Sequence, residues 1–261
     1  VGGTGNDALT GGTGDDILSG DAGDDILRGE AGADQLRGGA GDDTLYADSA
    51  DTAIEGGAGA DTLYVEGASG VSIGAGAGIE TAVGNVGNDV FDGSDLTTSA
   101  NFAGGDGNDT LTGGSGNDVL TGGAGDDTLS GGSGSDVAVY GGIQSDYQFG
   151  VDQSQLTVTH IATGAIDTLD GIETLEFADG PIGVSLDVNG GFALSGSSLE
   201  DTITVSSDAG FTLEGGDGAD VLEGGAGSDT LVGGIGSDVL VGGEGNDVAI
   251  YEGTQSDYRF G

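Results

Sequence analysis

Residues 2–19 read GGTGNDALTGGTGDDILS, two copies of a nonapeptide with the pattern Gly-Gly-x-Gly-x-Asp-x-(large apolar)-x. The pattern continues through residues 38–46 and returns at residues 104–130 and 215–241. A fixed period of this kind is typical of a repeat architecture in which each unit stacks on its neighbours. Since the large apolar residue recurs once in every nonapeptide, the sequence predicts one inward-facing side chain per repeat and a thin, continuous core.

The glycines of each repeat predict a tight turn. Glycine adopts positive φ without steric cost, but it loses more conformational freedom on ordering than any other residue. With 61 glycines, this chain resists folding unaided. The last three residues of a repeat, as in Ala8-Leu9-Thr10, are expected to form a very short strand.

The aspartate of each repeat lies beside this exposed backbone. Calcium is a hard cation that takes about six to eight oxygen ligands from carboxylates and carbonyl groups. One Asp per turn, next to bare carbonyl oxygens, supplies that chemistry. The alternative is a flexible Gly/Asp-rich linker without an ion, but a linker would not keep Asp and a large apolar residue in phase over so many repeats.

This iterated nonapeptide resembles the RTX calcium-binding repeat family, and the resemblance covers most of the chain. It implies an all-β fold, a right-handed parallel β-roll, in which two nonapeptides make one coil and every second repeat stacks on the same edge. In the family, each calcium ion lies between two stacked turns. By resemblance, ions are therefore expected between the pairs Asp7/Asp25, Asp16/Asp34, Asp25/Asp43, Asp109/Asp127, Asp118/Asp136, Asp220/Asp238 and Asp229/Asp247.

The candidate metal ligands are the motif aspartates and the turn glycines whose carbonyl groups approach the ion. The aspartates are Asp7, Asp16, Asp25, Asp34, Asp43, Asp61, Asp89, Asp109, Asp118, Asp127, Asp136, Asp220, Asp229, Asp238 and Asp247. The glycines are Gly3, Gly5, Gly12, Gly14, Gly23, Gly32, Gly41, Gly105, Gly107, Gly114, Gly116, Gly123, Gly125, Gly216, Gly218, Gly225, Gly227, Gly234 and Gly236.

Charge sets the conditions for folding. The chain has 46 acidic and three basic residues, a formal net charge of −43. Stacked aspartates repel one another without cations, so calcium binding and folding should be one event. The same charge excludes nucleic acid, which needs a basic surface, and direct attraction to an anionic membrane. A contact with an anionic polysaccharide through bridging calcium stays open.

The chain contains no cysteine. Calcium thus replaces disulfides as the stabilising link, which indicates a secreted, extracellular setting with millimolar calcium. No stretch is apolar enough to span a bilayer, and direct membrane insertion is not expected. No signal peptide is visible at the start, which opens within a repeat.

Interruptions of the nonapeptide pattern divide the chain into segments. We expect a first array over 1–63, a degenerate β-solenoid segment over 64–103, a second array over 104–139, a β-rich capping segment over 140–190, a connecting β segment over 191–214, a third array over 215–251 and the start of a second, truncated cap over 252–261. In the first array, residues 47–55 have lost their glycines and carry Thr52 where Asp belongs. The coil is expected to continue there without a full ion site.

A longer duplication lies over the nonapeptides. The sequence GGSGSDVAVYGGIQSDYQFG at 131–150 recurs as GGEGNDVAIYEGTQSDYRFG at 242–261. The segment that follows the second array resembles the cap after RTX arrays in secreted proteases, lipases and adhesins. Solenoids need closed ends, so its aromatic residues Tyr147 and Phe149 are expected to plug the core rather than to bind sugar.

No residue pattern favours catalysis. His160 is the only histidine and has no Cys or HExxH partner, so a structural or solvent-facing role is expected. Adjacent acids such as Asp15-Asp16 are not read as catalytic pairs, because the second is the calcium position and the first is variable. The chain itself is therefore expected not to be an enzyme.

These observations favour a calcium-folded structural module of a secreted bacterial protein, and the RTX resemblance adds the type I secretion machinery as a partner. The alternatives are a repeat module of a secreted metalloprotease, lipase or alginate epimerase, or the rod of a large calcium-dependent adhesin.

Overall fold

The computed structural model describes residues 1–186 and 190–251. These residues form β-strands and one short 3₁₀ helix, η1 (Gln144–Asp146), and contain no α-helix. The chain divides into two compact units. Unit 1 comprises Val1–Val139 and Asp167–Ile172, and unit 2 comprises Tyr140–Ile166 and Glu173–Gly261.

Unit 1 is a roll with strands on two opposed walls. One wall begins with β1 (Gly3–Thr4), β3 (Ile17–Ala22), β5 (Gln35–Ala40) and β7 (Ala53–Ala58) and continues with β9 (Ser72–Ile73), β11 (Val90–Asp92), β13 (Thr110–Gly114), β15 (Thr128–Gly132) and β19 (Ile166–Asp170). The other wall holds β2 (Ala8–Thr13), β4 (Ile26–Ala31), β6 (Thr44–Ala47), β8 (Thr62–Val65), β10 (Thr81–Val83), β12 (Asn101–Asp106), β14 (Val119–Ala124) and β16 (Val137–Val139).

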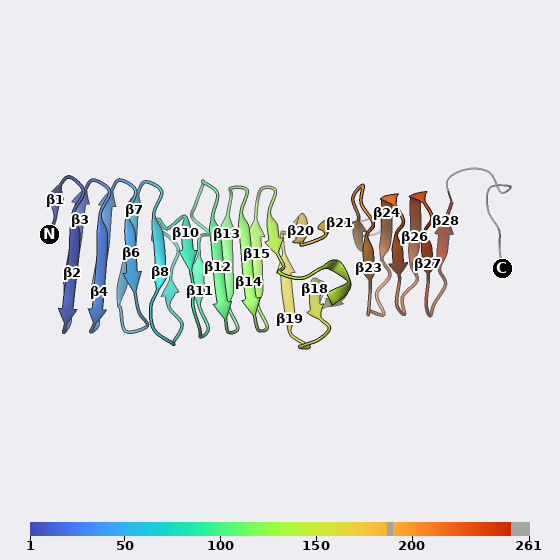
Figure 1. The fold of residues 1–261 in the computed structure, drawn as a ribbon, viewed down its shortest axis with the longest axis horizontal. Helices are drawn as coiled ribbons and strands as arrows, with labels where there is room; N and C mark the ends of the chain where they lie inside the picture. Colours follow the sequence, from blue (N-terminus) through green and yellow to red (C-terminus); the bar gives the residue numbers. More distant parts are fainter. Residues whose placement is uncertain (187–189, 252–261) are drawn as a thin grey trace. The chain divides into compact units, whose positions relative to one another are not determined.

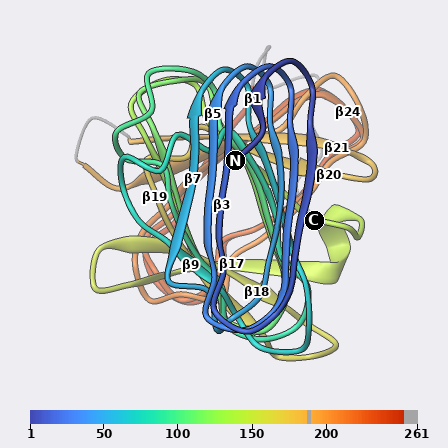
Figure 2. The same cartoon turned by 90° about the vertical axis from the view of Figure 1, so that its left-hand side faces the viewer.

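Each strand of the regular arrays pairs in parallel with the strand at the same place in the next coil. Leu9 faces Leu27, which faces Leu45 in turn, while Leu18 faces Leu36 on the other wall. Consecutive strands lie on opposite walls and point in opposite directions (Figure 1). Seen end-on, the blue N-terminal coils are nearly superposed (Figure 2). The inward side chains form a core one residue wide per strand, in which Leu27 and Leu45 are fully buried.

The turns between these strands use the glycine backbone as the sequence predicts. Gly12 and Gly14, at the second and fourth motif positions, have φ of 103° and 106°. Among the candidate glycines, Gly114, Gly116, Gly227 and Gly236 lie outside this positive-φ region. Asp21 and Glu30 replace glycine at the second position and still adopt positive φ, 76° and 68°. The backbone of these two coils thus follows the same path as in the other coils, although a residue with a side chain must adopt a strained conformation there.

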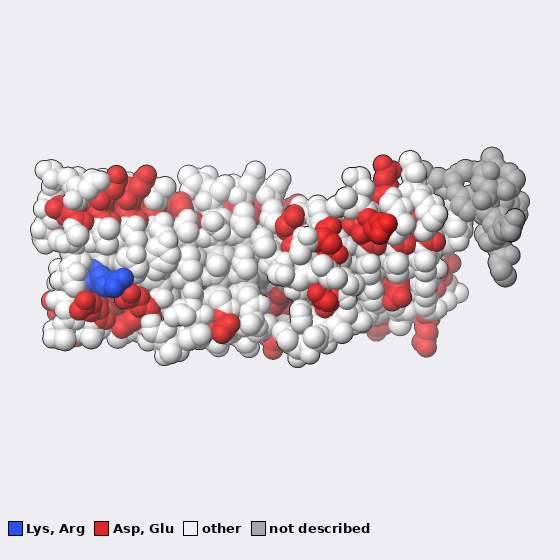
Figure 3. All heavy atoms as spheres, in the orientation of Figure 1, with Lys and Arg blue, Asp and Glu red and all other residues white. Residues whose placement is uncertain are grey.

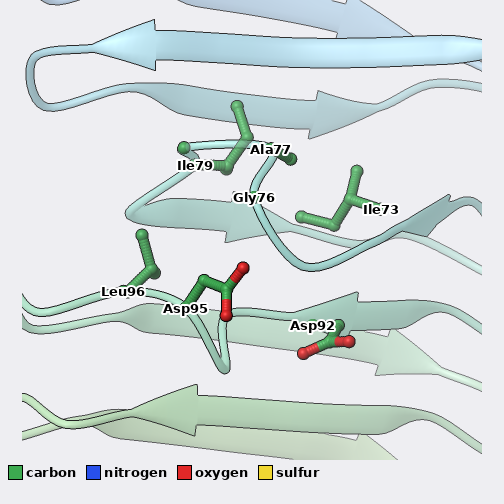
Figure 4. A pocket seen from close by; sticks show the side chains of 9 residues that line it. Ile73, Gly76, Ala77, Ile79, Asp92, Asp95 and Leu96 are labelled. Carbon is green, nitrogen blue, oxygen red and sulfur yellow. The ribbon is translucent and has the colours of Figure 1, made fainter.

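The degenerate segment 64–103 continues the roll with longer coils. Thr62 faces Thr81, which faces Asn101 in turn, so each of these coils contains more residues than a coil of the regular arrays. Phe91 and Phe102 are buried here, with ring centroids 5.8 Å apart. The irregular path leaves a cavity of about 110 Å³, lined by Ile73, Ile79 and Leu96 with Asp92 and Asp95 beside them (Figure 4).

The last coil of unit 1 closes after a long insertion. β19 lies in the range 140–190 but pairs in parallel with β15, so that Thr128 faces Thr168 and Leu129 faces Leu169. Leu169 is buried and extends the core ladder. The insertion between these neighbouring strands leaves the roll and returns to it in phase.

Unit 2 combines an antiparallel part with a second roll. The antiparallel part contains β17 (Tyr147–Asp152), β18 (Gln155–His160), β20 (Thr174–Phe177), β21 (Gly180–Leu186) and β22 (Phe192–Ser195). The second roll has one wall of β24 (Thr212–Gly218), β26 (Thr230–Gly236) and β28 (Val248–Ile250), and another of β23 (Thr202–Thr204), β25 (Val221–Glu223) and β27 (Val239–Val241).

Aromatic residues form the core of the antiparallel part. Tyr140, Tyr147 and Phe177 lie within 5.1–5.3 Å of one another by ring centroids. Phe149 packs edge-on against Phe177 at 6.2 Å and is fully buried. Tyr147 and Phe149 are therefore packing residues of this aromatic core, and their role as a plug of the roll stays a prediction.

The predicted all-β fold of stacked parallel coils, a β-roll, is confirmed by these strands and registers. The expected start of a second cap at 252–261 lies outside the described residues.

Candidate calcium sites

The motif aspartates line the interior of both rolls. Asp43 precedes β6 by one residue, and Leu45 follows two positions later on the same face of the extended chain. Both side chains therefore point inward, and both residues are at most 1% exposed. The other motif aspartates that are at most 1% exposed are Asp25, Asp34, Asp61, Asp89, Asp109, Asp118, Asp127, Asp136, Asp220 and Asp229. A column of carboxylates thus follows each wall beside the apolar core.

One oxygen of each carboxylate joins neighbouring coils. The Oδ1 atom of Asp25 accepts a hydrogen bond from the backbone N–H of Asp7 at 2.7 Å, and Asp43 accepts from Asp25 at 2.8 Å. The same bond, 2.7–3.2 Å long, links the pairs Asp16/Asp34, Asp43/Asp61, Asp89/Asp109, Asp109/Asp127, Asp118/Asp136, Asp220/Asp238 and Asp229/Asp247. All seven pairs expected to flank ions are therefore stacked and bonded.

The other oxygen has no hydrogen-bond partner. Among the described residues, this holds for the buried Oδ2 atoms of Asp7, Asp16, Asp25, Asp34, Asp43, Asp61, Asp89, Asp109, Asp118, Asp127, Asp220 and Asp229. A buried carboxylate oxygen without a partner costs on the order of several kcal/mol, and a native protein keeps such a group when a cation or a proton compensates it. A whole row of them indicates a row of cation sites.

Glycine at the first motif position makes room beside that oxygen. A methyl group on Gly11 would lie 2.8 Å from both Asp16 Oδ2 and the carbonyl oxygen of Gly29 in the next coil. A carboxylate oxygen and a backbone carbonyl oxygen thus converge on a space that any side chain would fill. Oxygen-only ligands in a flexible arrangement suit calcium.

An ion in these turns would need ligands besides the carboxylates. In residues 1–186 and 190–251, no three His, Cys, Asp or Glu side chains converge as a metal-binding group. Backbone carbonyl oxygens of the glycine turns must complete the coordination shell. The candidate glycines and aspartates are therefore parts of one ligand set, and this assignment stays a prediction.

Burial disfavours the charged form of these aspartates. Desolvation raises the pKa of Asp61 and of Asp109 to about 6, although each accepts a backbone hydrogen bond that opposes the shift. Desolvation likewise raises the pKa of Asp43, Asp89, Asp118, Asp127, Asp220 and Asp229. Like charges in the stacked column add to the shift at most of these positions, so a divalent cation would relieve both causes.

A second series of coil-to-coil hydrogen bonds lies outside the inner row of aspartates; we call the two series the inner and outer ladders. At many repeats the residue before the motif Asp is exposed and polar, and its side chain accepts a hydrogen bond from the backbone N–H one coil later: Asp42 N–H donates to Asp24, and Ala60 N–H donates to Asp42. Asn6, Asp15, Asn88, Asn108, Asn117 and Ser228 accept in the same way. Asp, Asn and Ser all provide an acceptor oxygen and so exchange at this position, whereas Ala33, Ala60 and Ala219 interrupt the outer series.

Four ladder residues escape the nonapeptide pattern. The acceptor for Asp34 N–H is Asp51, at 3.0 Å, so Asp51 and not the next residue, Thr52, occupies the aspartate place of that coil. Glu80 accepts from Asp61 N–H at 2.9 Å. Asp167 accepts from Asp127 N–H across 40 residues, and Asp201 N–H donates to Asp220. The signal for the last two is the triplet Asp-Thr-(Leu/Ile), which also occurs at 43–45.

The two arginines that the structure describes, Arg28 and Arg37, form ion pairs with glutamates outside the inner row. Arg28 pairs with Glu66 at 3.1 Å and Arg37 with Glu55 at 3.8 Å, and all four side chains are at least 37% exposed. Arg28 also lies 4.2 Å from the ring centroid of Tyr46. On the face drawn in Figure 3, the blue patch lies over the N-terminal coils among red acidic atoms.

His160 has structural contacts. Its ring lies edge-on to Tyr147, with centroids 5.0 Å apart, and its Nδ1 lies 3.0 Å from the hydroxyl oxygen of Thr163. These contacts agree with the expected structural role.

The chain belongs to the RTX calcium-binding nonapeptide repeat family. The family model matches residues 1–68, 74–95, 103–138 and 214–249, which is more than half of the chain. The repeats of this family bind calcium, and the matched residues are a structural module with several calcium ions rather than a catalytic domain.

No curated protein matches the chain. Among solved structures, the extracellular lipase LipA from Serratia marcescens is similar, with 15% sequence identity and a TM-score of 0.25. The match covers 83% of this chain and 39% of the lipase chain. In the part of the chain that the structure describes, no helix is long and apolar enough to cross a membrane.

Proposed function

We propose that this chain is a calcium-triggered folding module of a secreted protein. The observation that carries the proposal is the row of buried Oδ2 atoms without partners, in a chain of net charge −43. In the absence of calcium, folding would bury these oxygens uncompensated and bring like charges together. In its presence, each ion brings two positive charges to a place where carboxylate and carbonyl oxygens already converge.

Coupling between binding and folding follows from mass action. An ion that binds the folded coil but not the extended chain stabilises the folded coil. Once the ion concentration exceeds the dissociation constant, the free energy of stabilisation grows with the logarithm of that concentration. Each coil contacts its neighbours through the core ladder, so folding propagates along the roll. Extracellular calcium modules bind at about 10⁻⁴–10⁻³ M, and this range would keep the chain unfolded in a calcium-poor cytosol.

Far-UV circular dichroism during a calcium titration tests this function. We expect a cooperative change from a disordered spectrum to a β-sheet spectrum at sub-millimolar to millimolar calcium. Magnesium at equal concentration should have no effect, because it prefers a rigid octahedral shell and retains its water. A chain that is folded in chelator, or unfolded at saturating calcium, would contradict the proposal.

The physiological use that fits this behaviour is export through the type I secretion machinery. An extended acidic chain can be transported, and folding in external calcium would prevent its return. Alanine substitutions at Asp109, Asp118 and Asp127 should therefore slow secretion of the parent protein, measured as its amount in the medium over time. Unchanged secretion would mean that export does not depend on calcium-induced folding. It would not contradict the proposal that the chain binds calcium.

The activity of the parent protein is a separate proposal. The long duplication that pairs residues 131–150 with 242–261 is the observation that favours a repetitive parent such as an adhesin, in which the roll acts as a spacer. A secreted enzyme is the alternative. A protease parent requires an HExxH motif and a lipase parent a nucleophile elbow, so sequencing the flanking coding region decides between them.

A further inference from the structure

Two turns of the ladder differ from the others in how the aspartate is satisfied. We call a turn open when the Oδ2 atom of its ladder aspartate has no hydrogen-bond partner, and closed when backbone N–H groups donate to both oxygens or to Oδ2 alone. Asp43 is a representative of the open turns. The turns at Asp51 and Asp201 are closed.

Asp201 in unit 2 is 1% exposed and is surrounded by donors. Its Oδ2 accepts from the backbone N–H of Ser197 at 2.6 Å and from the Ser197 hydroxyl at 3.2 Å. Its Oδ1 accepts from the side-chain amide of Gln144 at 2.7 Å. Gln144 is itself fully buried, and its Oε1 accepts from the N–H of Thr202 at 2.7 Å. The carboxylate is thus compensated by hydrogen bonds alone.

The sequence of this turn explains the change. Residues 196–201 read GSSLED, so Ser197 and Leu199 occupy the places that glycine holds in the next coil, at Gly216 and Gly218. Those glycines have φ of 102° and 149°, whereas neither Ser197 nor Leu199 adopts positive φ. The backbone therefore takes another path and turns an N–H group toward the carboxylate. An N–H dipole directed at this space repels a cation.

Asp51 in unit 1, which is partly exposed, also accepts backbone hydrogen bonds at both carboxylate oxygens. It lies 17 residues after Asp34, one fewer than in the regular coils, and its Oδ1 accepts from Asp34 N–H. Its Oδ2 accepts from the N–H of Asp48 at 2.9 Å. Ala47 stands where the open turns have their first glycine, so a methyl group replaces the free space beside the carboxylate.

We propose that the closed turns at Asp51 and Asp201 bind no calcium, and that their hydrogen bonds perform the compensation that the ion performs in the open turns. Each roll thus contains a metal-free turn beside metal-binding ones. The Asp201 turn, which begins the second roll, would keep its geometry when calcium is removed from the coils that follow it.

The test is the number of calcium ions per chain, measured on the full chain by native mass spectrometry at saturating calcium. The double variant Ser197→Gly/Leu199→Gly restores the motif at 196–201, and we expect it to bind one ion more than the parent chain. Ser198→Gly changes a variable position of the same turn and should leave the count unchanged. Circular dichroism in calcium checks that each variant is folded.

A second pair of variants tests the closed turn of unit 1. Asp51→Ala should retain the full number of ions, whereas Asp43→Ala in an open turn should lose at least one. A folded double variant with an unchanged count, or loss of an ion from Asp51→Ala, would overturn the proposal. If the double variant does not fold, the Asp51→Ala count decides. The inference rests on calcium binding by open turns, and the Asp43→Ala count tests that premise separately.

Discussion

The inner and outer rows of the rolls lie one position apart in sequence, and residues 42 and 43 show that an aspartate in one row differs from an aspartate in the other in burial and in bonding. Asp43 is 1% exposed, accepts from the coil before it and keeps Oδ2 without a partner. Asp42 is exposed and accepts from the coil after it. The alternation of side chains produces the difference, because neighbouring residues of an extended chain point to opposite sides. The inner row thus requires a cation, and the outer row fastens coils without one.

The largest expected effect comes from removing several residues of one row together. The triple variant Asp109→Ala/Asp118→Ala/Asp127→Ala deletes consecutive inner carboxylates of the second array. It should abolish the calcium-dependent folding of that array, because the ions lose their charged ligands and the coils lose the bonds between them. Circular dichroism amplitude against calcium concentration measures this loss.

The matched outer variant is Asn108→Ala/Asn117→Ala/Asp126→Ala. It removes the outer acceptors Asn108 and Asn117 together with the exposed acid Asp126, and leaves every inner carboxylate in place. We expect the calcium concentration at the folding midpoint to change by no more than about tenfold, because exposed substitutions contribute about 0.5 kcal/mol or less each and about 1.4 kcal/mol corresponds to a factor of ten. Equal damage from both triple variants would remove the distinction between the rows.

A single pair of substitutions sharpens the comparison. Asp43→Asn keeps an acceptor oxygen for Asp25 N–H and removes the charge, so it should lower stability at saturating calcium by about 1–3 kcal/mol. Asp42→Asn keeps the outer bond to Ala60 N–H and reduces the net negative charge, so it should be neutral within about 0.5 kcal/mol. Thermal unfolding at fixed calcium measures both, and a neutral Asp43→Asn would contradict the inner role.

Adjacent glycines allow a smaller test of the space beside the carboxylate. Gly11→Ala would place a methyl group 2.8 Å from Asp16 Oδ2, whereas Gly12→Ala meets nothing within 4 Å and strains only the backbone, at φ 103°. We expect Gly11→Ala to weaken calcium binding and Gly12→Ala to cost about 1 kcal/mol of stability with little change in affinity. Calcium titration calorimetry separates the two, and equal affinities would show that the space holds no ion.

The sequence predicts the parts of this molecule that obey the nonapeptide period. Leu27, Leu45, Asp25 and Asp43 follow from the period because a parallel roll repeats the same contacts at every second nonapeptide. Prediction failed at Asp51, which lies one position before the aspartate place of the nonapeptide in a coil of unchanged length and still accepts the hydrogen bond from Asp34 N–H.

Other ladder residues depend on contacts distant in sequence. Asp167 returns to the ladder after a 40-residue separation, and only its Asp-Thr-Leu triplet marks it. Gln144 donates to the carboxylate of Asp201, 57 residues away, and no local sequence pattern predicts such a partner. Periodicity therefore predicts the open turns, while the closed turns require knowledge of the tertiary structure.

The smallest expected effect concerns protons as substitutes for calcium on the inner row. The pKa of Asp61 and of Asp109 is about 6 in the folded chain and about 3.9 in an unfolded one, so the folded state binds protons more tightly. The stabilisation by these protons is fully present below about pH 4 and is lost as pH rises through about 6. In calcium-free buffer, residual β-structure should therefore be greater at pH 4.5 than at pH 7.5.

At limiting calcium, the affinity for the ion should instead rise with pH, because protons compete with calcium for the same oxygens. Circular dichroism at both pH values, with and without calcium, measures the two dependences. The outer carboxylates serve as the internal reference, since Asp42→Asn should leave the profile unchanged. A calcium-free chain whose β-structure increases toward pH 7.5 would mean that the inner oxygens are compensated by something other than a cation or a proton.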